Sequence, residues 1–148
     1  MTQPPTGDVT FLFTDIVGST ALWDQRPEAM TDALAEHDER IRTIVDGLDG
    51  YVFTTAGDSF AVAFGSATGA VSAAVEIQLA MRNPGHGLDL PVRIGLHSGT
   101  ATVRNGDYFG GAVNRAARIS ASAHAHQIVV SQPPVDPLGP ALPDDVAL

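Results

Sequence analysis

Two aspartates interrupt apolar, β-favouring stretches of the chain, and both are candidates for metal chemistry. The run VTFLFTD (9–15) stops at Asp15, and TTAGDSFAVAF (54–64) carries Asp58 between its two halves. In a strand, Asp15 shares a face with Phe13 that a sheet normally buries, so its carboxylate needs a cationic partner. Mg²⁺ and Mn²⁺ prefer carboxylate oxygens and would let both aspartates stay ionised side by side. The alternative is that Asp15 caps a helix and Asp58 is an ordinary turn residue.

The residues that follow Asp15 could bind phosphate. The segment IVGST (16–20) places Gly18, Ser19 and Thr20 at the start of a helix, where free backbone N–H groups favour an anion. A phosphate bridged by metal to the two aspartates could therefore extend over these residues. A lysine-based phosphate loop is excluded, because all 8 basic residues of the chain are arginines.

A second group of polar residues lies in NGDYFGGAVNRAARIS (105–120). The spacing predicts a helix over 112–123 in which Asn114 and Arg118 stand four residues apart on one face. Arginine offers a fork of donors to phosphate oxygens, and asparagine can bond to a ribose oxygen. The alternative is a solvated pair on a helix surface. The residues expected to form the packing face of this helix are Val113, Ala116, Ala117 and Ser120.

The apolar periodicity predicts the elements that must position these residues. In chain order they are a strand from residue 8, a helix over 19–48 broken around Pro27, a hairpin over 51–64, a helix over 66–81, a break over 83–87, a strand over 91–104, a turn over 105–111, the helix over 112–123 and a short strand over 127–130. This order predicts an α+β fold, a ferredoxin-like split βαββαβ sheet whose two helices pack on one face. The end of the first strand and the hairpin turn can be neighbours in such a sheet, which would bring Asp15 and Asp58 together.

Composition limits the classes of partner. The chain has 148 residues, 44% of them hydrophobic, which suits one packed domain. Its formal charge of −9 argues against nucleic acid or an anionic membrane as the main partner. It contains no cysteine and no stretch long and apolar enough for a signal peptide or a membrane span, so a soluble, cytoplasmic domain is expected.

Four stretches, in order, resemble successive motifs of the class III nucleotidyl (adenylate/guanylate) cyclase catalytic domain of bacterial type: VTFLFTDIVGST, TTAGDSFAVAF, VRIGLHSGT and GDYFGGAVNRAARI. The resemblance implies a flexible lead over 1–7, the cyclase catalytic domain over 8–132, and a Pro-rich segment over 133–148 that begins a truncated C-terminal part. It also implies that a nucleoside triphosphate is converted to a cyclic nucleotide and pyrophosphate. The sites would lie at the interface of a homodimer, with two Mg²⁺ or Mn²⁺ ions per site.

The resemblance assigns the first group of residues to metal and phosphate. Asp15 and Asp58 match the family's metal-binding aspartates, and Ile16 matches the residue that adds its backbone carbonyl. The segment Gly18, Ser19 and Thr20 matches the one that lies against the phosphates. In this family one metal assists attack of the ribose 3′-hydroxyl on the α-phosphorus, and the other neutralises the leaving pyrophosphate.

The resemblance assigns the second group to ribose, transition state and base. Asn114 matches the residue that orients the ribose, Arg118 the one that stabilises charge on the transferred phosphoryl group, and Asp107 the one that reads the base. Adenylate cyclases usually carry a lysine where this chain has Thr54, so weaker base discrimination is expected. Asp107 still suits the amino group of adenine and repels the guanine carbonyl, which favours ATP and cyclic AMP.

Two alternatives remain open from the sequence. The chain could be a degenerate cyclase-like module that binds nucleotide or only dimerises, because Thr54 replaces the lysine and the chain stops before a strand pair that the family usually carries. It could also be a cyclase selective for GTP or a pyrimidine triphosphate, since cytosine too offers an exocyclic amine to Asp107.

Overall fold

The computed structural model describes residues 4–82, 90–131 and 146–147. Its elements are β1 (Gly7–Ile16), α1 (Ser19–Gln25), α2 (Pro27–Gly47), β2 (Tyr51–Ala56), β3 (Ser59–Phe64), α3 (Ala67–Arg82), β4 (Val92–Arg104), β5 (Asp107–Phe109), α4 (Gly111–Ser122), β6 (Ile128–Val130) and β7 (Val146–Ala147). The break expected over 83–87, residues 1–3 of the lead and residues 133–145 of the Pro-rich segment lie outside the described residues.

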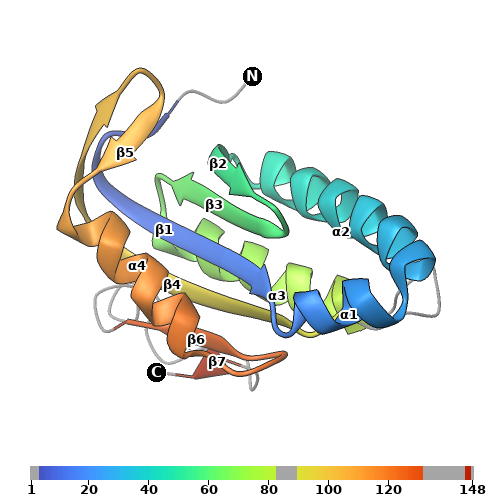
Figure 1. Ribbon diagram of the computed structural model, residues 1–148. Helices are drawn as coiled ribbons and strands as arrows, with labels where there is room; N and C mark the ends of the chain where they lie inside the picture. The colour runs from blue at the N-terminus through green and yellow to red at the C-terminus, as the bar shows by residue number, and fades with distance from the viewer. Residues whose placement is uncertain (1–3, 83–89, 132–145, 148) are drawn as a thin grey trace.

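One sheet organises the molecule, with the strand order β2-β3-β1-β4-β6-β7 and β5 paired to β4. The first four strands have the ferredoxin-like arrangement, with β1 between β3 and β4 in antiparallel register. Helices α2 and α3 cover one face, as the split βαββαβ pattern predicts, while α4 crosses the opposite face (Figure 1). The predicted fold class is therefore confirmed, and α4 adds a helix on the second face.

Strand β1 is central and buries both of its faces. Leu12 and Ile16 belong to the core beneath α2 and α3, whereas Val9 and Phe11 pack on the side of α4. Side chains alternate along a strand, so Asp15 continues the row that begins at Val9 and faces the side of α4. This alternation decides which helix can meet the candidate metal ligand.

The helical region over 19–48 divides where the sequence predicts. Helix α1 ends at Gln25, and α2 begins with Pro27 at its first position. Proline is well tolerated there, because the N–H that it lacks would have no hydrogen-bond partner within the helix. The chain turns after Gly47, and Gly50 packs so closely that a Cβ there would come within 2.7 Å of a ring atom of Phe64. None of the described helices combines the length and apolar character needed to cross a membrane.

The turn expected over 105–111 contains a short strand that was not predicted. Asn105 and Gly106 have φ of 54° and 77°, and this tight turn sends β5 back along β4. Tyr108 in β5 is buried, and its hydroxyl donates to the carbonyl of Pro5 at 2.6 Å. Burial, helped by Tyr51, raises the pKa of Tyr108 to about 12. These contacts hold the β4–β5 hairpin against the start of β1.

Candidate active site

Asp15 is held by an arginine from the neighbouring strand. Asp15 in β1 and Arg93 in β4 are direct partners in the antiparallel register. Nε of Arg93 donates to Oδ1 of Asp15 at 2.6 Å, and Nη2 donates to Oδ2 at 3.0 Å. These hydrogen bonds raise the pKa of the Arg93 guanidinium, the negative charges of Asp15 and Asp58 act in the same direction, and partial burial opposes them. Arg93 is the cation that a carboxylate at the end of β1 requires.

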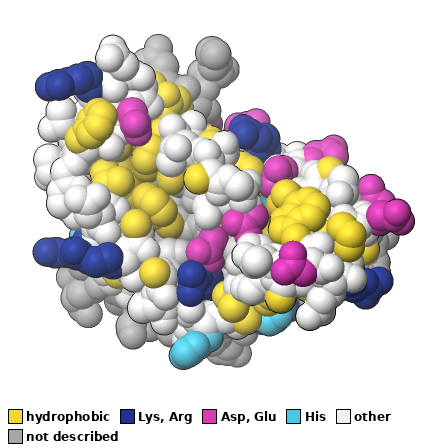
Figure 2. All heavy atoms as spheres, in the orientation of Figure 1, with side chains coloured by type: hydrophobic (Ala, Val, Ile, Leu, Met, Phe, Trp, Pro, Cys, Tyr) yellow, Lys and Arg dark blue, Asp and Glu magenta, His cyan; other side chains and the backbone are white. Residues whose placement is uncertain are grey.

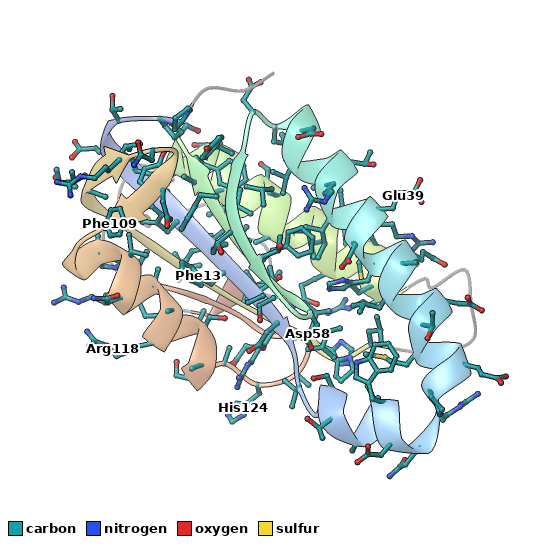
Figure 3. All side chains as sticks on the ribbon, turned by 45° about the horizontal axis from the view of Figure 1, so that its top comes forward. Phe13, Glu39, Asp58, Phe109, Arg118 and His124 are labelled. Carbon is teal, nitrogen blue, oxygen red and sulfur yellow. The ribbon has the colours of Figure 1, made fainter. Side chains whose placement is uncertain are left out.

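Asp58 lies in the turn between β2 and β3, beside the end of β1. The register pairs Thr14 with Phe60, so the next residue of β1 reaches the start of β3 and the turn that precedes it. Figure 3 places Asp58 at this end of the sheet. The Oδ2 atom of Asp58 is buried without a hydrogen-bond partner among the described residues. The expectation that the end of the first strand and the hairpin turn are neighbours agrees with this register.

The two carboxylates fit a divalent cation. A buried carboxylate oxygen without a partner is costly, and a dication is the partner that removes this cost. Within the described residues no three His, Cys, Asp or Glu side chains gather to hold a metal, so the ligands available here are Asp15, Asp58 and backbone carbonyls. Ile16 is the last residue of β1, with its side chain in the core. This donor set suits Mg²⁺ or Mn²⁺, which complete their coordination with water and substrate phosphate.

The segment between β1 and α1 has the conformation that its glycine permits. Gly18 caps α1 with φ of 70°, a left-handed conformation that favours glycine. Its carbonyl accepts from the N–H of Leu22 at 3.3 Å, and no side chain caps the helix. The reading of Asp15 as the helix cap is therefore wrong. Ser19 is half-buried and Thr20 is exposed at this start.

A cavity of about 250 Å³ opens beside Asp15. Its walls come from the ends of β1, β2 and β3 and from the last turns of α4, and most of its lining is apolar or small. Thr54 of β2 lies on its wall. The register of β2 against β3 shifts between Val52 and Thr54. The lining residues are Phe13, Thr14, Asp15, Thr54, Ala56, Ser59, Phe60, Ala61, Ala117, Ser120 and Ala121.

The second group of predicted residues lies on α4 and β5, which are different elements from those that carry Asp15 and Asp58. Asn114 and Arg118 are exposed on α4, and Figure 3 shows Arg118 projecting away from Asp58. Asp107 is exposed at the start of β5, where its Oδ1 accepts from the N–H of Tyr108 at 2.8 Å.

The packing face of α4 differs from the expectation at one residue. Ala116 and Ser120 are buried, and the hydroxyl of Ser120 donates to the carbonyl of Phe13 at 3.2 Å. Val113 is half-buried, but Ala117 is exposed and lines the cavity instead. Helix α4 therefore contacts the sheet mainly through Ala116 and Ser120, and the side of the helix that carries Ala117 faces the cavity.

Arg93 is the residue of this site that sequence reasoning missed. The signal was present in PVRIGLHS (91–98), where a single arginine interrupts an apolar strand much as Asp15 interrupts β1. An acid in one buried strand and a base in another suggest a cross-strand pair, once the two strands are known to be neighbours.

Comparison with known proteins agrees with this architecture. The family model described as the adenylate and guanylate cyclase catalytic domain matches residues 1–140. An uncharacterized protein of Mycobacterium tuberculosis is 37% identical over 147 residues, covering 98% of this chain and 50% of the relative. An adenylate cyclase of Podospora anserina is 35% identical over 154 residues, covering 86% of this chain and 7% of that protein.

A solved structure shows the same likeness. A structure of adenylate cyclases from Trypanosoma brucei in their monomeric state superimposes with a TM-score of 0.82 at 29% identity, covering 87% of this chain and 74% of that one. The chain spans half the length of its mycobacterial relative. From the match over residues 1–140 and the shared fold, the chain belongs to the family of adenylate and guanylate cyclase catalytic domains.

Proposed function

We propose that two copies of this chain form an adenylate cyclase that converts ATP to 3′,5′-cyclic AMP and pyrophosphate. One observation carries the proposal: Asp15 and Asp58 lie together at the end of β1, while Arg118 projects from α4 away from Asp58 and Asn114 is exposed on the same helix. A single chain therefore holds half of each of two sites. Two copies facing each other would complete both.

The carboxylate half would hold the metal and the triphosphate. Asp15, Asp58 and the backbone carbonyl of Ile16 are the proposed ligands for Mg²⁺ or Mn²⁺, two ions per site. When bound, the ions would supply Lewis-acid activation of the ribose 3′-hydroxyl and neutralise negative charge on the leaving pyrophosphate. The backbone between Gly18 and Thr20 would lie against the phosphates, where N–H groups at a helix start stabilise negative charge.

The α4 half would orient the nucleotide. The amide of Asn114 would hold the ribose so that its 3′ oxygen faces the α-phosphorus. The 3′-hydroxyl would give up its proton to water, and its oxygen would bond to phosphorus as the bond to pyrophosphate breaks. The guanidinium of Arg118 would stabilise the charge that develops on the phosphoryl oxygens. Asp107 and Thr54 would contact the base, Asp107 accepting from the amino group of adenine. The adenylate cyclases among the relatives support the choice of ATP.

An uncovered apolar surface supports the homodimer. Figure 2 shows hydrophobic side chains gathered over the sheet face that α4 leaves open. Phe13 and Phe53 are only half-buried there, and Phe109 on the β4–β5 hairpin is 52% exposed. Apolar surface of this kind, rimmed by charged residues, is typical of a protein interface. The partner proposed for it is a second copy, which would bring its own α4 to the carboxylates.

A mixing experiment tests the two-copy site. Purified Asp15→Ala and Arg118→Ala chains should each be inactive with ATP and Mn²⁺, and their mixture should recover up to about a quarter of wild-type activity, since one site in each mixed dimer is intact. Mass identification of products with ATP, GTP, CTP and UTP would establish the base. A mixture of Asp15→Ala with Asp58→Ala chains is the matched control, and it should recover no activity because both changes fall in the carboxylate half.

The assay with the four triphosphates also distinguishes an active cyclase from a degenerate module that only binds nucleotide or dimerises. That second candidate is favoured by the ion pair that already neutralises Asp15 in this chain. If wild-type chains dimerise and bind nucleotide but form no cyclic product with any of the four triphosphates, the module replaces the enzyme. A cyclic product other than cyclic AMP would keep the enzyme and overturn the choice of ATP.

A further inference from the structure

Arg93 and a metal ion require the same atoms of Asp15. Both carboxylate oxygens of Asp15 accept hydrogen bonds from the guanidinium, at 2.6 Å and 3.0 Å. Such a two-point pair uses a lone pair on each oxygen and is among the stronger ion pairs. A cation in this position also repels a dication that approaches the same oxygens. A divalent ion can therefore coordinate Asp15 only by opening or weakening this pair.

The guanidinium is anchored on its other side. Nη1 of Arg93 donates to the carbonyl of Ala121 at 3.0 Å, in the last turn of α4. The three nitrogens that can donate thus all have partners, two on Asp15 and one on α4. Loss of Asp15 as a partner would leave the bond to Ala121, so the positive charge would remain beside the site.

The two candidate metal ligands differ in how the chain satisfies them. Asp15 is paired, with its side chain and that of Arg93 each about one-quarter exposed. Oδ2 of Asp58 is buried and has no partner among the described residues. Among the described residues, the chain thus pairs both oxygens of Asp15 and leaves one oxygen of Asp58 without a partner. A site prepared only for structural stability would satisfy both.

We propose that Arg93 is a displaceable internal cation: it occupies Asp15 in the metal-free chain, and a divalent ion enters the site by displacing it. The proposal rests on the function proposed above, in which Asp15 and Asp58 bind metal. Arg93 is in this sense a positioning residue that acts through Asp15. Its presence lowers the affinity for free metal, and Asp58, which accepts none of the three hydrogen bonds of Arg93, is the first ligand that an arriving ion meets.

If Arg93 supported Asp15 as a metal ligand, its removal would change the metal affinity in the opposite direction. If Arg93 were a fixed support that orients Asp15 for the metal, its removal would loosen the carboxylate and weaken metal binding. If it is a competitor, its removal frees the oxygens and removes a repelling charge, and metal binding becomes tighter. The sign of the change in affinity therefore separates the two roles.

Titration with Mn²⁺ alone, followed by the electron paramagnetic resonance signal of the free ion, measures this sign without any catalysis. Arg93→Ala is expected to bind Mn²⁺ about fivefold more tightly than wild type, the upper range for losing a partly exposed ion pair. Arg93→Gln, which removes the charge but keeps a donor, should shift in the same direction and serves if the alanine variant does not fold. Arg104→Ala removes one charge from the far end of β4 and controls for net charge.

A double-mutant cycle localises the effect. Adding Arg93→Ala to an Asp15→Asn chain should tighten Mn²⁺ binding by clearly less than in the wild-type background, because only the repelling charge is lost and no contested carboxylate is freed. Equal or weaker binding by Arg93→Ala and Arg93→Gln overturns the proposal, and so does an equal gain in the Asp15→Asn background. An Asp58→Asn chain that binds Mn²⁺ as well as wild type would instead remove the metal site and, with it, the proposed function.

Discussion

Gly95 in β4 lies directly against the backbone of Ser120 in α4. A Cβ atom on Gly95 would come within 2.3 Å of the Ser120 amide nitrogen and 2.5 Å of its Cα. Only a residue without a side chain permits this approach. The contact fixes the height of α4 above the sheet, and α4 carries both Asn114 and Arg118. Helix α4 can keep this position only if residue 95 is glycine, which has no Cβ atom.

Replacing Gly95 with alanine should therefore push α4 away from the sheet. We expect the free energy of unfolding to fall by about 2 kcal/mol, as in other cases of overpacking, and cyclase activity to fall with it. Urea denaturation followed by circular dichroism measures the first effect. Gly47→Ala is the control, since a Cβ there meets nothing within 4 Å. Equal stability of Gly95→Ala and wild type would show that α4 adjusts freely.

The carboxylate of Asp58 is expected to lower the free energy of unfolding when no metal is bound. Its Oδ2 atom is buried without a hydrogen-bond partner among the residues that the structure describes, which is costly for a carboxylate oxygen. Asp58→Asn is expected to raise the free energy of unfolding by about 1 kcal/mol without divalent ions, and to abolish any rise in melting temperature on adding Mn²⁺. Calorimetry with and without Mn²⁺ measures both. The exposed Asp32→Asn should do neither, and a Mn²⁺-dependent rise that survives in Asp58→Asn would argue against this residue as a ligand.

His97 should make the fold sensitive to mild acid. It is 6% exposed, its Nδ1 lies 2.7 Å from the hydroxyl of Ser131, and burial together with the charge of Arg115 lowers its pKa. The unfolded chain takes up the proton near pH 6.5 while the folded chain resists it, so stability is present above that pH and is lost as pH falls below it.

Urea midpoints at pH 7.5, 6.5 and 5.5 measure this loss. Wild type is expected to lose stability over this range, and His97→Gln should lose less. The exposed His124→Gln is the matched control and should follow wild type. Identical pH slopes for His97→Gln and wild type would place the acid sensitivity elsewhere.

Thr54 should limit discrimination among bases. It lines the cavity beside Asp15, and its short neutral hydroxyl offers one weak contact where related adenylate cyclases usually carry lysine. Thr54→Lys is expected to raise the ratio of kcat/KM for ATP over GTP by about tenfold. Thr55→Lys places the same charge one residue along the strand, on its other face, and should leave the ratio unchanged. Equal ratios in both variants would remove Thr54 from base selection.

Local signals in the sequence determined most of the elements. Pro27 splits the long helix, the left-handed Gly57 makes the hairpin turn, and alternation in β1 assigns its side chains to two faces. These features act over a few residues, which is the range that periodicity and turn chemistry can report. The four motifs likewise indicate the cyclase family from residue types and order alone, and the family model that matches residues 1–140 agrees.

Tertiary structure decided how the charges meet. Asp15 and Arg93 are separated by 78 residues, and only the insertion of β1 between β3 and β4 makes them neighbours. The same packing leaves Ala117 exposed and Oδ2 of Asp58 without a partner among the described residues. A linear pattern says which residue types are present and which way they face along one strand. It does not give the exact register between neighbouring strands, and ion pairs, close approaches and unsatisfied atoms all depend on that register.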